Sequence, residues 1–214
     1  MDTAPAPEDQ RTRQAALRRF IGGIGIGLPI VLPVGKVLFF GPGLPPTISA
    51  YYYTDMRNVL VGALCAIGVY LLYYPGYDRG DNITTAAAGL GAITLALSPT
   101  TPPAPEVPTT AEVVAGVIHY TGAGVFFLGL AYLSYFRFTR TAGAPTREKL
   151  QRNVLYRVCG IVMVVAIAMA VLLDNVLPAA VLDAAVPVFW LEAVAVLAFG
   201  VSWLVKGVAL LRDR

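Results

Sequence analysis

Six long apolar runs, separated by short polar or proline-rich segments, divide the chain. A helix needs about 20 apolar residues to cross a bilayer core, and the runs lack the alternation of membrane-barrel strands. We therefore predict an all-α polytopic membrane protein with six transmembrane helices. The predicted spans are residues 20–40, 48–76, 82–97, 112–136, 155–173 and 187–205.

The segments at the two ends of the chain differ from these runs in composition. Residues 1–19 are rich in Pro, Ala and charged side chains, and we expect them to form a disordered cytoplasmic tail. The bundle is predicted to cover residues 20–206, and residues 207–214 a second cytoplasmic tail. Pro29 and Pro33 lie inside the first run, so its helix should be bent or locally unwound.

Basic residues lie mainly on one side of the predicted spans. The opposite loops carry Asp and Glu, with Arg57 as the one basic residue beyond the span ends. The positive-inside rule then places both termini in the cytoplasm. Composition agrees, because the chain is 57% hydrophobic and only 14% charged, whereas soluble domains carry about 25% charged residues. The net charge of +3 needs no nucleic-acid partner, since the basic residues sort by membrane side.

The fourth run carries the single histidine of the chain, His119. In a helix, residues 115, 116, 119, 122 and 123 share one stripe, and the others are Gly or Ala. Small residues allow neighbouring helices to pack closely in lipid, so His119 should face other helices. An ionisable group inside a membrane is by default a candidate functional residue.

Several polar residues are predicted to lie at one depth near the outer face of the membrane. They come from four of the predicted helices and are Lys36, Ser49, Asp55, Arg57, His119 and Glu192. Burying one charge alone costs about 2.5–3.5 kcal/mol on insertion scales. We therefore expect a shared cavity in which Glu192 pairs with His119, Lys36 or Arg57. A purely structural His119–Glu192 pair, fixing helix register, remains an alternative.

Three functions remain open for this cavity. The first is binding of a membrane lipid headgroup or small amphiphile, without chemistry. Its ligand-binding residues would be Lys36, Tyr52, Tyr53, Arg57, His119, Trp190 and Glu192. The sequence does not decide whether the chain forms a homo-oligomer.

The other two functions use the same polar residues differently. In a metal-independent lipid hydrolase, Ser49 would attack and His119 would act as general base, with Asp55 or Glu192 orienting the imidazole. In a proton-coupled transporter of small solutes, His119 and Glu192 would titrate together. No cofactor is predicted, and no metal, because one histidine with two carboxylates is an uncommon ligand set.

Several stretches resemble a bacterial family of uncharacterised six-helix membrane proteins and, distantly, the DRAM-like membrane proteins. They are ISAYYYTDMRN, GLGAITLALSPTTP, VIHYTGAGVFFLGLAYLSYF and, less closely, FWLEAVAVLAFGVSWLVKG. The resemblance implies a six-helix fold in a bacterial plasma membrane and a lipid-related or regulatory role. It carries over Ser49, Pro99 and His119. A weaker likeness to the ceramidase and progestin-receptor superfamily rests on Ser49, but this chain lacks the histidines that hold zinc there.

Overall fold

The computed structural model describes residues 7–76, 78–102, 107–141 and 143–212. All regular structure in these ranges is helical, with no strand among them. Two elements are not α-helices: η1 is a short 3-10 helix and η2 a π-helical turn. The elements are α1 (Pro7–Phe40), η1 (Ser49–Tyr53), α2 (Arg57–Leu72), α3 (Arg79–Leu97), α4 (Thr110–Tyr132), η2 (Leu133–Arg137), α5 (Arg147–Val176), α6 (Ala179–Ala185) and α7 (Pro187–Arg212).

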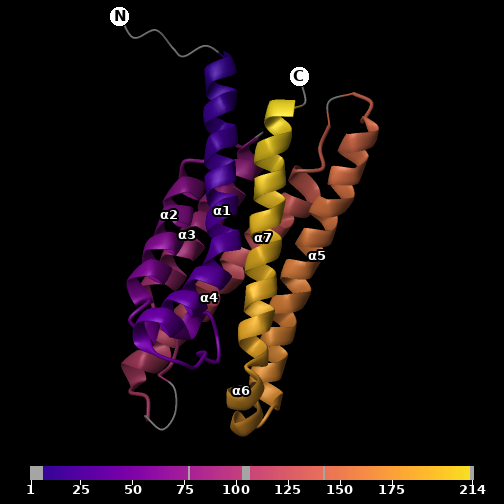
Figure 1. Ribbon diagram of the computed structural model, residues 1–214. Coiled ribbons are helices and arrows are strands. Elements are labelled where there is room, and N and C mark those ends of the chain that lie inside the picture. Colours follow the sequence, from indigo (N-terminus) through magenta and orange to yellow (C-terminus); the bar gives the residue numbers. More distant parts are fainter. Residues whose placement is uncertain (1–6, 77, 103–106, 142, 213–214) are drawn as a thin grey trace, which may run out of the picture.

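The long helices run alternately up and down one bundle, and both termini lie at the same end (Figure 1). We call this end the basic end, because it buries Arg18, Arg137, Lys149 and Lys206. The opposite end holds η1, the α1–α2 connection and the short helix α6 (Figure 1). We call it the pocket end, for the cavity described below.

Four helices are long and apolar enough to cross a membrane. They cover Thr12–Phe40, Thr110–Arg137, Arg147–Val176 and Pro187–Ala209. Helix α2 is apolar but shorter, and α3 does not meet the same criteria of length and hydropathy within the described residues. The all-helical fold is therefore confirmed, and the four long apolar helices indicate a membrane protein.

Side-chain caps set the start of three helices. The Asp78 carboxylate accepts a hydrogen bond from the Asp81 amide and begins α3. Thr109 and Glu112 form a capping box at α4, and Thr146 accepts from the Lys149 amide at α5. Such caps satisfy amides that have no partner within the helix. Helix α5 therefore begins well before the predicted span 155–173.

Helix α1 differs from the prediction at its N-terminal end, and at Pro29 and Pro33 it lacks local unwinding, one of the two predicted irregularities. Residues 7–19, predicted to be disordered, are helical from Pro7 onward, and residues 1–6 lie outside the described residues. Proline is tolerated at the first position of a helix, and the following Glu, Gln, Arg and Ala favour helix. Local unwinding at Pro29 and Pro33 is not observed, because α1 continues through both.

The predicted span 48–76 is two elements rather than one. Its first part forms η1, whose Tyr51 is fully buried against the ring of Phe189 in α7. A break at residues 54–56 then precedes α2. Neither η1 nor the short helix α6 was predicted. The first is held by contacts with α7, and the second begins after Pro178 and has no buried residue.

Glycines bring the helix backbones close together. A Cβ added at Gly91 in α3 would lie 2.7 Å from the Gly122 carbonyl oxygen in α4. A Cβ at Gly68 in α2 would lie 2.9 Å from the Gly89 carbonyl oxygen in α3. These contacts, together with the burial of His119 on the same face of α4, confirm that the small-residue stripe packs against other helices.

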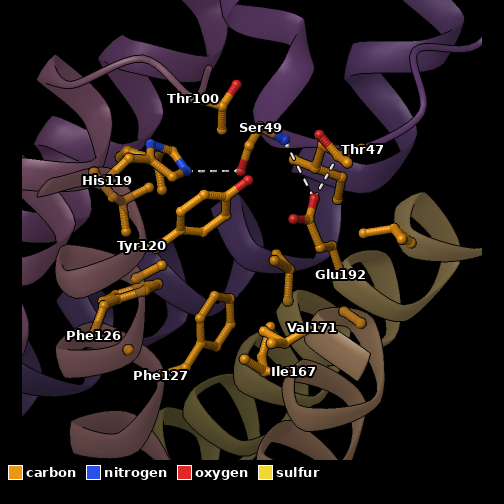
Figure 2. Close-up of a pocket in the computed structure, with 18 of the residues that line it drawn as sticks. Thr47, Ser49, Thr100, His119, Tyr120, Phe126, Phe127, Ile167, Val171 and Glu192 are labelled. Atoms are coloured by element: carbon orange, nitrogen blue, oxygen red, sulfur yellow. Dashed lines mark hydrogen bonds between the residues drawn. The ribbon is translucent and has the colours of Figure 1, made fainter. Parts of the chain in front are cut away.

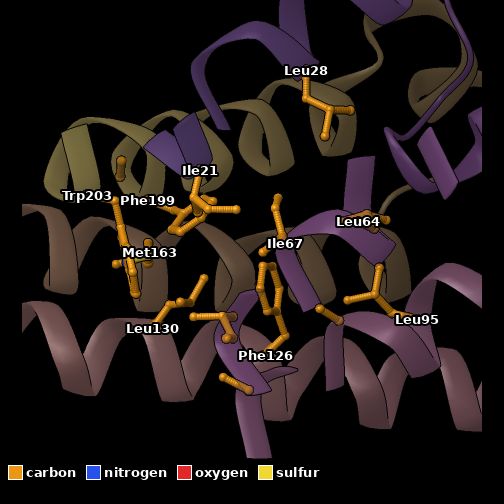
Figure 3. Packing of buried hydrophobic residues seen from close by; sticks show 14 of the residues in the cluster. Ile21, Leu28, Leu64, Ile67, Leu95, Phe126, Leu130, Met163, Phe199 and Trp203 are labelled. Atoms are coloured by element: carbon orange, nitrogen blue, oxygen red, sulfur yellow. The ribbon is translucent and has the colours of Figure 1, made fainter. Parts of the chain in front are cut away.

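The apolar core runs through the middle of the bundle (Figure 3). On its basic side the indole of Trp203 is fully buried and contacts the rings of Tyr70, Tyr74 and Phe138. On its other side the core stops at a cavity, whose floor includes Ile67, Leu95, Phe126 and Phe199. The same apolar side chains therefore stabilise the bundle and shape the candidate site.

Candidate functional site

The α1–α2 connection is fixed in place by the first turns of α7. The Phe189 amide donates to the Pro46 carbonyl oxygen over 2.9 Å. Two turns into the bundle, Oε2 of Glu192 accepts hydrogen bonds from the amides of Ile48 and Ser49, at 2.6 and 3.3 Å. A carboxylate at these amides takes the place of a helix cap, because the first amides of η1 have no partner within it. Ser49 is thus held by its backbone.

The imidazole of His119 bridges the end of α3 and the start of η1. Its Nδ1 lies 2.7 Å from the Ser98 carbonyl oxygen, and its Nε2 lies 3.1 Å from Ser49 Oγ (Figure 2). A carbonyl oxygen can only accept, so Nδ1 carries the proton. In the neutral ring Nε2 is then the acceptor, and the Ser49 hydroxyl donates to it.

The predicted contact between His119 and Glu192 is wrong. Ser49 lies between the two side chains, with its hydroxyl on the imidazole and its amide on the carboxylate (Figure 2). The physical reason is that each side chain forms a hydrogen bond with a backbone group that has no partner within its own helix. These are the Ser98 carbonyl and the first amides of η1.

The two predicted cationic partners of Glu192 also bind elsewhere. The ammonium of Lys36 donates to the carbonyl oxygens of Gly41 and Pro42, at 3.1 and 2.7 Å. The guanidinium of Arg57 lies 3.9 Å from the centre of the Tyr52 ring and donates to its hydroxyl. Both cations are satisfied within their own segment, so neither reaches the carboxylate.

A cavity of about 470 Å³ opens beside Ser49, His119 and Glu192. All six long helices contribute to its lining, with α4, α5 and α7 beside η1 and the connection before it at one end (Figure 2). The apolar wall includes Phe127 of α4 and Ile167 and Val171 of α5. The polar end consists of Thr47, Ser49, Tyr52, Thr100, His119, Tyr120, Asp174, Asn175 and Glu192.

Four of the residues predicted for the site line this cavity, namely Ser49, Tyr52, His119 and Glu192. Five others do not. Two of these are Lys36 and Arg57, described above. The other three are Tyr53, whose hydroxyl donates to the Thr100 carbonyl, Asp55, which is exposed, and Trp190, whose indole is 56% exposed. Asp55 therefore does not orient the imidazole.

Sequence reasoning missed part of the polar end. Tyr120 follows His119 directly in the sequence. Asp174 and Asn175 come at the end of an apolar run, where polar residues usually mark the boundary of a membrane span. The structure shows that α5 runs on to Val176, so this polar pair lies beside Glu192 at the pocket. An acidic residue just past an apolar run was the available signal.

No group of three or more His, Cys, Asp or Glu is arranged for a metal ion in the part of the chain that the structure describes. Comparison with protein-family models, with curated proteins and with solved structures gives no match. Function must therefore be inferred from the geometry of the pocket.

Proposed function

We propose that this protein spans the plasma membrane of a bacterium six times, with both termini cytoplasmic, and binds a lipid or small amphiphile in the pocket. The observation that carries this is a cavity of about 470 Å³ with one polar end and long apolar walls. Ligand pockets typically have volumes of about 300–1,000 Å³ and mix apolar walls with a few polar groups.

The arrangement of the helices supports six spans. The 16 residues of α2 and the 19 of α3 correspond to lengths of about 24 and 28 Å at 1.5 Å per residue. Both lie in the same alternating bundle as the four longer helices (Figure 1). Buried and exposed basic residues gather at the end that holds both termini, as expected for a cytoplasmic face.

The ligand would enter from the lipid, between α4 and α5. Near the basic end these helices touch, since a Cβ at Gly160 would lie 3.0 Å from the Ala131 carbonyl oxygen. Toward the pocket end their facing side chains line the cavity instead, Phe127 on α4 and Ile167 on α5 (Figure 2). An alkyl chain would pass between these two side chains while its polar group moves to Glu192 and His119.

Photolabelling in lipid nanodiscs tests this function. A neutral long-chain alcohol with a diazirine in its chain should label peptides of α4 and α5 that line the pocket, and excess unlabelled alcohol should compete. Val171→Trp fills the cavity from α5 and should reduce labelling about tenfold, as expected when about 1.4 kcal/mol of binding energy is lost. Leu172→Trp is the matched control, because Leu172 is 52% exposed and does not line the cavity. Equal labelling of both variants would refute binding in this pocket.

A serine hydrolase is a second candidate, supported by the contact of 3.1 Å between Ser49 Oγ and His119 Nε2. Nucleophile and base are within hydrogen-bond reach, and a backbone carbonyl orients the imidazole. However, the amides of Ile48 and Ser49, the donors nearest to the nucleophile, already hold Glu192. They are therefore not free to stabilise an oxyanion.

A fluorophosphonate probe distinguishes the hydrolase from the binding protein. Covalent labelling of Ser49 in the folded chain, lost in Ser49→Ala, would establish a nucleophile. If Ser49 is not labelled in protein that still binds the alkyl probe, the hydrolase is excluded and binding without chemistry remains. Proton-coupled transport, the third hypothesis, lacks the direct contact between His119 and Glu192 on which it was based.

A further inference from the structure

The ionisable side chains of the pocket lining include two acids and, among the described residues, no Lys or Arg. The acids are Glu192 and Asp174. Lys36 and Arg57, the two cations predicted for the site, are bound to backbone carbonyls and to the Tyr52 ring. An anionic headgroup would therefore enter beside two carboxylates without a cation to compensate it, and such like-charge juxtaposition is unfavourable.

One oxygen of Glu192 is left for a ligand. Both amide hydrogen bonds, from Ile48 and Ser49, go to Oε2. No described residue donates to Oε1, which is directed into the pocket toward Tyr120 (Figure 2). A carboxylate oxygen in this position accepts hydrogen bonds and favours positive charge.

The remaining polar groups also suit a cation. The hydroxyl of Tyr120 and the side-chain oxygen of Asn175 are acceptors at the polar end of the pocket, whereas the Tyr52 hydroxyl already accepts from Arg57. The Tyr120 ring offers a π face within the same space, and such faces attract ammonium groups. Phe127 and Val171 continue the pocket as an apolar wall for a chain.

We infer that the pocket selects amphiphiles with a cationic head, an alkylammonium on a long chain, over neutral or anionic ones. This rests on the proposed function and adds the chemical class of the ligand. The ammonium lies between Glu192 Oε1 and Asp174, and the chain runs along the faces of α4 and α5 that line the cavity. The charged group is thus selected by the two carboxylates, and the chain by the apolar wall.

Competition between chain-matched amphiphiles tests the inference. In nanodiscs of zwitterionic lipid, the photoreactive alcohol is displaced by tetradecylamine, tetradecanol or tetradecyl phosphate. The amine should compete at about one tenth of the concentration that the alcohol requires, and the phosphate should be weakest. Partition into the bilayer differs among the three, so the comparison is made between variants for each competitor.

Two variants test whether the carboxylates select the ammonium group. Glu192→Gln and Asp174→Asn should each reduce the preference for the amine over the alcohol several-fold, while Asp183→Asn should leave it unchanged. Asp183 is the matched control, an exposed acid in α6 at the same end that does not line the pocket. Asp174 is exposed and makes no hydrogen bond with any residue that the structure describes, so its variant remains informative if Glu192→Gln disturbs the α1–α2 connection.

The outcomes separate the inference from the proposed function. If the phosphate competes as well as the amine, or if both variants keep the wild-type preference, selection for a cation is wrong while binding stands. If the photoreactive alcohol labels nothing in the pocket, the proposed function itself fails.

Discussion

The two ends of the bundle bury polar side chains in different surroundings. At the basic end Arg137 pairs with Asp78 and Asp81, and Lys149 and Lys206 both donate to the Phe138 carbonyl oxygen. At the pocket end His119 binds the Ser98 carbonyl and the Ser49 hydroxyl, and Glu192 binds the amides of Ile48 and Ser49. Both of these side chains line the cavity.

This difference separates structural charges from candidate ligand-binding ones. At the basic end Arg137 and Asp81 are buried as an ion pair, an arrangement that can fix helix register. At the pocket end Glu192 Oε1 has no donor among the described residues and is directed into the cavity, which costs stability unless something binds there. Burial of a charge is therefore a weak indicator of function, and the direction of its free atoms a better one.

Loss of the cation at the basic end should have the largest effect. Arg137→Gln leaves Asp81, which is 1% exposed, without its counter-charge. We expect a loss of about 3–5 kcal/mol in the free energy of unfolding, the usual consequence of breaking a buried pair. Thermal unfolding in nanodiscs measures the change, and labelling by the alkyl probe should persist in the fraction that folds.

Arg140→Gln is the control for this variant. Arg140 also contacts Asp78, at 3.1 Å, but its side chain is 53% exposed, so the change should stay below about 1 kcal/mol. The double variant Asp81→Asn with Arg137→Gln should recover part of the lost stability, because no buried charge is then left alone. Equal effects of the two single arginine variants would contradict a structural role for the basic end.

Two glycine variants compare the face of α4 that packs against α3 with the face that lines the pocket. Gly91→Val introduces a side chain where a Cβ already lies 2.7 Å from the Gly122 carbonyl oxygen, and should cost about 1–3 kcal/mol through overpacking. Gly124→Ala places a methyl group at the pocket wall, where nothing lies within 4 Å. It should be neutral or stabilise by up to about 1 kcal/mol through helix propensity.

Thermal unfolding of both glycine variants under the same conditions is the measurement. Similar losses for Gly91→Val and Gly124→Ala would mean that the α3–α4 contact is no tighter than the pocket wall.

The smallest expected effect is the pH dependence of the exposed carboxylate at the basic end. Hydrogen bonds from Arg137, the Asp81 amide and Arg140 hold the pKa of Asp78 well below its ordinary value. Because the folded-state pKa is lowered, the stabilisation is complete at neutral pH. It is lost as the pH falls below about 4, the ordinary value for aspartate, toward the lowered one.

Asp78→Asn should therefore lower the melting temperature slightly at pH 7 and flatten its decline on acidification. Salt should weaken the difference, since exposed charges are screened. If wild type and variant show parallel curves down to acid pH, the carboxylate contributes nothing to stability.

The helical fold was predictable because surfaces that face lipid require apolar side chains over the whole length of a span. The stripe around His119 also predicted the helix contact correctly, since close packing in lipid depends on small residues. Helix ends were less predictable. The Thr146 cap and the helix from Pro7 lie outside the apolar runs, and the burial of Tyr51 against Phe189 is a contact between two of them.

The site was predictable in some of its members and not in their partners. Ser49, His119 and Glu192 do line one pocket, as their predicted depth suggested. Their hydrogen bonds go to the Ser98 carbonyl and to amides of η1, backbone groups that every residue carries and that sequence does not mark. A search for charged partners therefore assigned Lys36 and Arg57, which are satisfied locally.

The contact between Glu192 and the amides of Ile48 and Ser49 joins residues 144 and 143 positions apart. During synthesis the first connection between helices emerges long before the last helix that completes it. A chain that ends before α7 lacks the carboxylate that holds Ile48 and Ser49, so the pocket is completed only when the last helix joins the bundle.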